Sequence, residues 1–164
     1  WDTDNVLSRN FRTVKELQPF SLEESDYEGS GYDMGHLYGL QFVSASQHAA
    51  EVNEVSVIAA QRPTLNRRVW IQAENRIRQL SSTQEVQVLN GQLWLKPMPG
   101  LAMANEPHRV ASHCYSLIRL PVPCTEEAYL IPQDCLPDDQ LSKHKIEPSK
   151  LKEMISTQWT NALN

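Results

Sequence analysis

The sequence lacks the features that mark several special classes of protein. It has no apolar run near the ~20 residues that a membrane-spanning helix requires, so we expect no membrane partner. It has no internal repeat and no low-complexity tract. Its 15 Lys+Arg and 20 Asp+Glu give a net charge of −5, which argues against a protein that coats nucleic acid through bulk positive charge. What remains is a globular chain of 164 residues, for which we expect a single domain over residues 1–164.

Cysteine is also scarce, and its three residues all lie in the last third of the chain. An odd count fits neither a complete disulfide framework nor a four-ligand zinc site. Two interpretations stay open: a Cys124–Cys135 bridge, as in an exported protein, or three reduced thiols including Cys114. Because the sequence starts at Trp1 without an initiator Met, we expect a processed product and a secreted or exported protein.

The clearest predicted element is a helix that starts after Pro63, with Thr64 as its N-cap, and ends near Leu80. Apolar residues at helical spacing predict a buried stripe, which consists of Val69, Ala73, Ile77 and Leu80. A second row has a spacing of four, which drifts by only ~40° per step in an α-helix. It consists of Asn66, Trp70, Glu74 and Arg78. Because Asn and Glu suit a core poorly, this row predicts a functional site, with Trp70 packing beside it.

The other predicted elements are mostly strands. Residues 54–60 are apolar and β-branched and predict a short buried strand. Asn90-Gly91 lies between two alternating segments, 85–89 and 92–95, and predicts a hairpin turn. Two further strands and a closing amphipathic helix are expected at 112–120, 127–131 and 148–159. Strands, one long helix, more strands and a terminal helix predict an α+β fold.

The segment with the clearest chemical potential is residues 29–37, Gly-Ser-Gly-Tyr-Asp-Met-Gly-His-Leu. His36 follows Gly35, whose backbone freedom can hold an imidazole in an unusual pose. Thirty residues later Asn66 stands near the start of the predicted helix, which also carries Glu74. A lone histidine near a loop is usually a bystander, but its combination with Asn66 and Glu74 favours a functional site.

These segments resemble the DNA/RNA non-specific endonucleases of the ββα-metal class. The family's Asp-Arg-Gly-His segment, usually preceded by Ser-Gly-Tyr, is matched by residues 30–36. Its later Leu-Asn, followed by Trp and by Glu four residues beyond, is matched by Leu65-Asn66, Trp70 and Glu74. Residues 8–12 resemble the segment that supplies a phosphate-contacting arginine, here Arg9. The resemblance is specific from Arg9 to about Leu80 and looser from residue 84 onward.

The resemblance implies both a fold and an activity. The fold is the ββα-metal (His-Me finger) fold, with a central antiparallel sheet, one long metal-binding helix and a C-terminal helix. The activity is hydrolysis of DNA and RNA by a metal-dependent, sequence-non-specific endonuclease that leaves 5′-phosphate ends. The implied cofactor is Mg²⁺, for which Mn²⁺ can substitute, and the implied partners are DNA and RNA.

The resemblance also assigns roles to individual residues. His36 would be the general base, and imidazole, with a reference pKa of about 6.5, can accept a proton at neutral pH. Asn66 would be the sole protein ligand of a hydrated Mg²⁺, an ion that prefers oxygen donors and retains most of its waters. Glu74 would orient the water ligands of that ion. Arg9 and Arg78 would neutralise the charge that builds up on the phosphate.

Positive charge is concentrated on the predicted helix. Five arginines lie within residues 61–80, namely Arg62, Arg67, Arg68, Arg76 and Arg78. We interpret this run as a patch that binds the nucleic-acid backbone, against the alternative of a merely solvated helix face. The predicted substrate-binding residues are Arg9, Arg62, Arg67, Arg68 and Arg78.

Two departures from the family pattern leave alternatives open. Met34 stands where the family usually has Arg, and Val57 stands where many relatives have Asn. The chain could therefore be a degenerate nuclease fold that binds nucleic acid or a protein without cutting. The Trp1 start and the short length leave a further alternative open, the toxin domain of a secreted effector held inactive by a small inhibitor or immunity protein.

Overall fold

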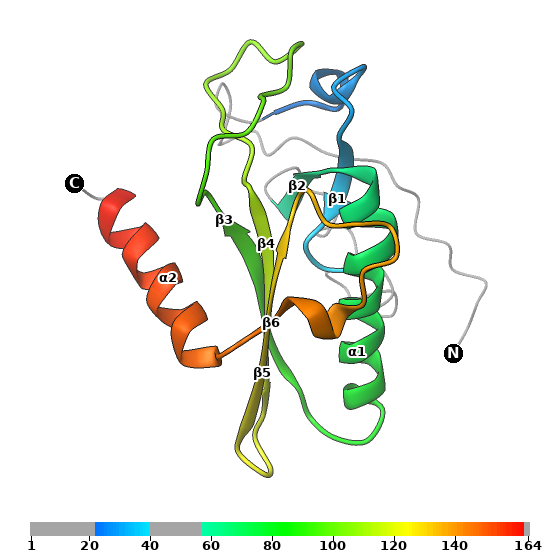
Figure 1. The fold of residues 1–164 in the computed structure, drawn as a ribbon, viewed down its shortest axis with the longest axis vertical. Coiled ribbons are helices and arrows are strands. Elements are labelled where there is room, and N and C mark those ends of the chain that lie inside the picture. The colour runs from blue at the N-terminus through cyan, green and yellow to red at the C-terminus, as the bar shows by residue number, and fades with distance from the viewer. Residues whose placement is uncertain (1–21, 40–56, 163–164) are drawn as a thin grey trace. The chain divides into compact units, whose positions relative to one another are not determined.

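The computed structural model describes residues 22–39 and 57–162 of the chain, and Figure 1 labels their strands and helices. They fall into two compact units. Unit 1 contains the described residues up to Gln61 together with Pro99–Val110, and unit 2 contains Arg62–Met98 and the residues from Ala111 onward. The single domain expected over residues 1–164 stays a prediction.

Unit 1 is built on a pair of short antiparallel strands. β1 (Asp33–His36) pairs with β2 (Ile58–Gln61), in a register that sets Asp33 opposite Gln61 and His36 opposite Ile58. All four residues of β2 are buried, which confirms the buried strand expected at 54–60 for residues 58–60 and extends it to residue 61. Residues 54–56 of that prediction lie outside the described residues. A short 3-10 helix, η2 (Glu24–Tyr27), precedes β1.

Unit 2 contains a four-stranded antiparallel sheet in the order β3-β4-β5-β6. The strands are β3 (Gln87–Leu93), β4 (His113–Leu120), β5 (Thr125–Pro132) and β6 (Lys145–Ile146). β4 and β5 confirm the strands expected at 112–120 and 127–131. Two helices, α1 (Ile71–Ser81) and α2 (Pro148–Ala162), accompany the sheet (Figure 1).

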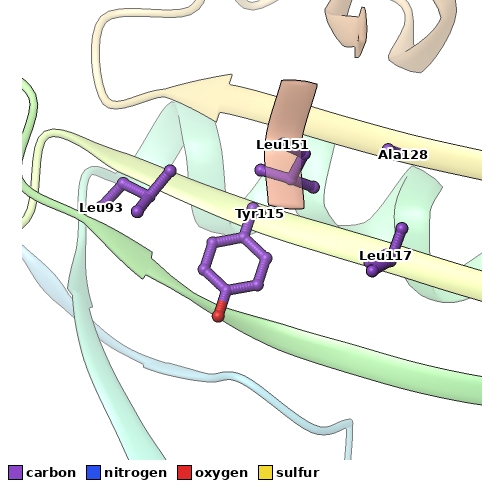
Figure 2. Packing of buried hydrophobic residues seen from close by; sticks show 5 residues of the cluster. All are labelled: Leu93, Tyr115, Leu117, Ala128 and Leu151. Atoms are coloured by element: carbon purple, nitrogen blue, oxygen red, sulfur yellow. The ribbon is translucent and has the colours of Figure 1, made fainter. Parts of the chain in front are cut away.

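The two helices contact opposite faces of this sheet. Successive residues of a strand point to opposite faces. Glu127 of β5 forms an ion pair with Arg76 of α1, whereas its neighbour Ala128 packs in a cluster with Leu151 of α2. Figure 2 shows the α2 side, where Leu93, Tyr115 and Leu117 complete the cluster; all five of these residues are buried. Helices on both faces shield the sheet from water.

The long predicted helix is confirmed in its buried stripe but not in its cap. Val69, Ala73, Ile77 and Leu80 are all buried, and the helix ends at Ser81. Thr64 already has helical backbone angles and its side chain makes no cap hydrogen bond, so its assignment as N-cap is wrong. An N-cap residue has non-helical backbone angles, so a threonine that is already inside the helix cannot cap its first N–H groups.

The hairpin turn predicted at Asn90-Gly91 is wrong. β3 runs through both residues without interruption, and Gly91 lies opposite Tyr115 of β4. A Cβ added at Gly91 would lie 2.4 Å from the Tyr115 hydroxyl oxygen. Glycine is needed here because the tyrosine side chain lies directly against the backbone, not because the chain turns.

All three cysteines are free thiols in the structure. Cys124 is exposed in the β4–β5 turn, whereas Cys114 and Cys135 are buried. Burial and the nearby Asp139 carboxylate raise the pKa of Cys135 to about 11, so this thiol stays protonated at neutral pH. Of the two interpretations that the sequence left open, a Cys124–Cys135 bridge and three reduced thiols, the structure therefore agrees with the reduced thiols. Within the described residues, no helix is long and apolar enough to cross a membrane.

Candidate active site

His36 is the last residue of β1, so it lies on a strand and not in a loop. It is half-buried, and the pairing continues beyond it because Leu37 N–H donates to the Val57 carbonyl at 3.1 Å. Gly35, the residue before it, packs against Gln61: a Cβ at this position would lie 2.1 Å from Gln61 Oε1. The Gly-His order therefore reflects a close contact between β1 and β2 that only glycine permits.

The Gly-Ser-Gly-Tyr segment before β1 has a structural role. Gly29 and Gly31 have φ values of 66° and 78°, which side-chain-bearing residues rarely adopt. Ser30 Oγ donates to the Tyr27 carbonyl at 2.7 Å and accepts the Tyr32 N–H at 3.1 Å. The buried Tyr32 donates its hydroxyl to the Pro99 carbonyl at 3.1 Å. This network fixes the path of the chain into β1 and towards His36.

Asn66 lies in the first helical turn after β2, within the predicted helix, although the π-helical form of this turn was not predicted. Residues Leu65–Trp70 form a π-helix, η6, which leads directly into α1. Such wide turns inside helices occur frequently at functional sites. Asn66 is half-buried between the fully buried Leu65 and the exposed Arg67, and its N–H donates to the Arg62 carbonyl at 2.9 Å. Its backbone is therefore firmly held.

Glu74 and Arg78 lie one turn apart on α1 and share one side of the helix. Glu74 is half-buried and Arg78 is exposed, with Arg78 Nη1 donating to Asn75 Oδ1 at 2.9 Å. Trp70 is almost fully buried, which confirms that it packs. Asn66, Glu74 and Arg78 thus belong to one continuous helical segment of unit 2. His36 belongs to unit 1, and Arg9 lies outside the described residues.

Four of the five helix arginines are exposed, namely Arg62, Arg67, Arg68 and Arg78. The fifth, Arg76, binds Glu127 through both its Nε, at 2.9 Å, and its Nη2. The Arg76 guanidinium is the main reason that the pKa of Glu127 falls to about 2, and Tyr129 adds a second hydrogen bond. Arg76 therefore attaches α1 to β5 and does not belong to the predicted patch.

Two glutamines that attach the helical segment to the rest of unit 2 were missed by the sequence analysis: Gln133, which follows β5, and Gln72 of α1. Gln133 accepts the Arg62 N–H at 2.8 Å and donates to the Ala111 carbonyl at 3.0 Å. Gln72 donates to the Asp139 carbonyl and accepts the Leu141 N–H, both at 2.9 Å. No local pattern marks either residue, because each partner is more than 20 residues away in the sequence.

The donor set of the helix suits a hydrated hard cation. Among the described residues, no three His, Cys, Asp or Glu side chains gather into a metal site. A carboxamide oxygen at Asn66 and a carboxylate at Glu74 offer only oxygen donors, the type that Mg²⁺ prefers. An ion that retains most of its waters needs few protein ligands, so these residues fit such a group.

Comparison with known proteins supports the same identification. The family model described as DNA/RNA non-specific endonuclease matches residues 3–159, and the match includes Arg9, His36, Asn66, Glu74 and Arg78. This family is generally metal-dependent, and an Mg-dependent phosphodiesterase is typical of it. Its ββα-metal fold agrees with the mixed α+β structure, antiparallel sheets and two helices found here. A search of the curated proteins finds no match. The chain belongs to the DNA/RNA non-specific endonuclease family, which implies that it cuts DNA and RNA without sequence preference.

Proposed function

We propose that the chain hydrolyses phosphodiester bonds of DNA and RNA with His36 as the general base and Asn66 as the protein ligand of Mg²⁺. The observation that carries the proposal is the order of elements: β1 with His36 at its end, the antiparallel β2, then η6 with Asn66 in its first turn. Two strands followed by a helix, with these two residues in these places, match the ββα-metal pattern.

His36 takes the proton from the attacking water. The pairing of β1 with β2 and the packing of Gly35 on Gln61 hold its backbone, so the imidazole starts from a fixed position. A general base of this kind contributes about 10²- to 10⁴-fold to the rate. Water attack with release of the 3′ oxygen leaves 5′-phosphate ends.

Asn66 and Glu74 are the residues that would hold the metal. The Asn66 carboxamide oxygen would be the direct ligand, and the Glu74 carboxylate would accept hydrogen bonds from water ligands of the ion. When bound, Mg²⁺ supplies positive charge that polarises the scissile phosphate and stabilises the leaving oxygen. Mn²⁺ prefers the same oxygen donors and can substitute.

The arginines supply charge without reading sequence. Arg9 and Arg78 neutralise the phosphate as negative charge accumulates on it. The exposed Arg62, Arg67 and Arg68 contact the backbone of the substrate. Phosphate contacts carry no direct base information, which explains cutting of both DNA and RNA.

A cutting assay on plasmid DNA and on an RNA transcript tests the assignment of the base. The parent protein should degrade both with Mg²⁺ or Mn²⁺ and neither with EDTA. His36→Ala should lose at least ~10²-fold in rate while its circular dichroism spectrum is unchanged. The control is His108→Asn, because His108 accepts the Leu101 N–H at 2.8 Å and has a structural role in unit 1. Equal rates for His36→Ala and the parent would show that the base is misassigned.

The metal ligand is tested separately with Asn66→Ala, for which we expect at least ~10-fold more Mg²⁺ at the half-maximal rate. Asn161→Ala is the matched control, because Asn161 is an exposed asparagine on the other helix, α2. Unchanged metal dependence in Asn66→Ala would contradict the role of Asn66.

A second candidate function is binding without cutting. Met34 is half-buried in β1 opposite Ala60 and supplies no cation where the family usually has Arg. This candidate predicts that the parent binds DNA but shows no turnover with any divalent metal. The inhibitor or immunity protein and the secretion expected from the sequence stay predictions; toxicity on expression, relieved by a co-expressed inhibitor, would support the former.

A further inference from the structure

We propose that Gln133 is a positioning residue for this reaction: its buried carboxamide fixes the backbone of Arg62 and, through it, the orientation of Asn66. The inference rests on the proposed function, because it concerns the metal ligand assigned there. Gln133 follows the last residue of β5 and is only 1% exposed.

The side chain of Gln133 uses both ends of its amide. Its Oε1 accepts the Arg62 N–H at 2.8 Å, and its Nε2 donates to the Ala111 carbonyl at 3.0 Å. Its own backbone N–H donates to the Ser112 carbonyl at 2.9 Å. One end of the amide is therefore bonded to Ala111, just before β4, and the other end to Arg62, just before the helix. Hydrogen bonds at both ends fix the direction of the amide as well as its position.

Arg62 lies next to the start of the helix, so its orientation passes directly to Asn66. Its carbonyl accepts the Asn66 N–H at 2.9 Å. Pro63 follows, and a proline has a fixed φ and no N–H. Arg62 therefore provides the last backbone donor before Pro63, and Gln133 is the side chain that binds it.

A glutamine suits this position because an apolar side chain of similar size could pack here but could not fix the direction of the Arg62 N–H. A buried carboxamide is costly unless its polar atoms are satisfied, and both polar ends of Gln133 are bonded. Gln72 makes a similar double hydrogen bond from α1 to the segment around Asp139 and Leu141. Gln72 fixes the helix further along, whereas Gln133 binds Arg62, the residue whose carbonyl accepts the Asn66 N–H.

The test compares two glutamines that make the same kind of double hydrogen bond. Gln158 of α2 accepts the Trp94 N–H at 2.9 Å and donates to the Gln92 carbonyl at 3.2 Å, and it contacts no part of α1 through these bonds. Gln133→Leu and Gln158→Leu therefore remove the same chemistry, the first beside Asn66 and the second on the other helix. The measurements are Mn²⁺ binding by electron paramagnetic resonance without nucleic acid, and the Mg²⁺ concentration at the half-maximal cutting rate.

We expect Gln133→Leu to weaken Mn²⁺ binding and to raise the half-maximal Mg²⁺ concentration by about 10-fold, with KM for DNA unchanged. Gln158→Leu should change neither quantity. If Gln133→Leu fails to fold, Gln133→Asn replaces it as the test variant. Its shorter side chain keeps an amide but cannot reach both the Arg62 N–H and the Ala111 carbonyl, so the half-maximal Mg²⁺ concentration should rise in the same direction as in Gln133→Leu.

Parent-like metal binding in a folded Gln133→Leu would overturn the inference, and so would equal weakening by Gln158→Leu. Parent-like metal binding in a folded Gln133→Asn would overturn the inference in the same way. The two proposals fail differently: an Asn66→Ala protein with normal metal dependence contradicts the proposed function itself. Normal dependence in Gln133→Leu alone, with Asn66→Ala impaired, contradicts only the role of Gln133.

Discussion

The two helices of unit 2 contact the same sheet, but they are attached to it by different interactions. The η6–α1 segment has an apolar stripe and, in addition, buried or half-buried polar attachments through Gln133, Gln72 and the Arg76–Glu127 ion pair. α2 packs mainly through the fully buried Leu151, with Met154 and Ile155 partly buried around it. Its polar attachments to the sheet include the two hydrogen bonds of Gln158 and an exposed Lys152–Glu126 ion pair.

This difference matches the proposed roles of the two helices. Apolar packing holds a helix against a sheet but tolerates small rotations and shifts, because the hydrophobic effect is not directional. Hydrogen bonds fix both direction and distance, which a site with sub-ångström requirements needs. The helix proposed to carry the metal ligand is attached by more of these directional interactions, at Gln133, Gln72 and Arg76, than α2 is at Gln158 and Lys152. α2 stabilises the fold without having to place a reactive group.

The largest expected difference between the roles of the two helices comes from removing the main apolar contact of α2. Leu151→Ala should lower the free energy of unfolding by about 3 kcal/mol, because it deletes a fully buried side chain and leaves a cavity. The rate of cutting per folded molecule should stay at the parent value. Urea unfolding and kcat at saturating Mg²⁺ measure the two effects. A large loss of kcat in folded Leu151→Ala would contradict the separation of roles.

The polar attachment of α1 gives a pH-dependent effect. The folded pKa of Glu127 is about 2, below its reference value of 4.5, because Arg76 and Tyr129 bond to the carboxylate. A depressed pKa stabilises the fold above pH ~4.5, and this stabilisation is lost as the pH falls from there towards 2. Glu127→Gln should therefore cost about 2 kcal/mol at pH 7 and much less near pH 2. Urea unfolding of both proteins at several pH values measures the difference, and a difference independent of pH would contradict this origin.

Much of the fold followed from local patterns in the sequence. The stripe from Val69 to Leu80 has helical spacing, and the structure buries all four of its members. The same holds for α2, whose predicted start at Pro148 is confirmed and whose Leu151 is fully buried, as an amphipathic helix requires. These elements were predictable because the period of apolar residues records the side that faces the sheet.

The failures occurred where a distant partner decides the structure. Asn90-Gly91 has the sequence of a hairpin turn, but Gly91 is small because Tyr115 of a neighbouring strand covers it. Thr64 has the sequence of an N-cap, yet the chain is already helical there and leads into a π-helix. A pattern of a few neighbouring residues carries no information about a contact with a residue far away in the sequence, such as that of Gly91 with Tyr115.

The candidate site shows the same division. His36, Asn66 and Glu74 were found from short motifs, and their roles stay predictions. Gln133 was not found, because its two partners lie 71 and 22 residues away and a lone glutamine has no motif. The residues proposed to contact the substrate or metal could be predicted from sequence motifs, whereas the residue proposed to position Asn66 could be identified only from the three-dimensional structure.

The smallest expected effect concerns the exposed charges of the two helices. Arg68 of η6 and Lys150 of α2 are both exposed cations, but only Arg68 belongs to the proposed substrate-binding set. Arg68→Ala should raise KM for DNA about 3-fold, which corresponds to ~0.7 kcal/mol, and should reduce the slope of log KM against log salt by up to about one. Lys150→Ala should leave both unchanged, since it changes the net charge equally but lies on the other helix. Equal effects of the two substitutions would show that the protein senses only overall charge, and that the arginines of the long helix do not form a specific backbone-binding surface.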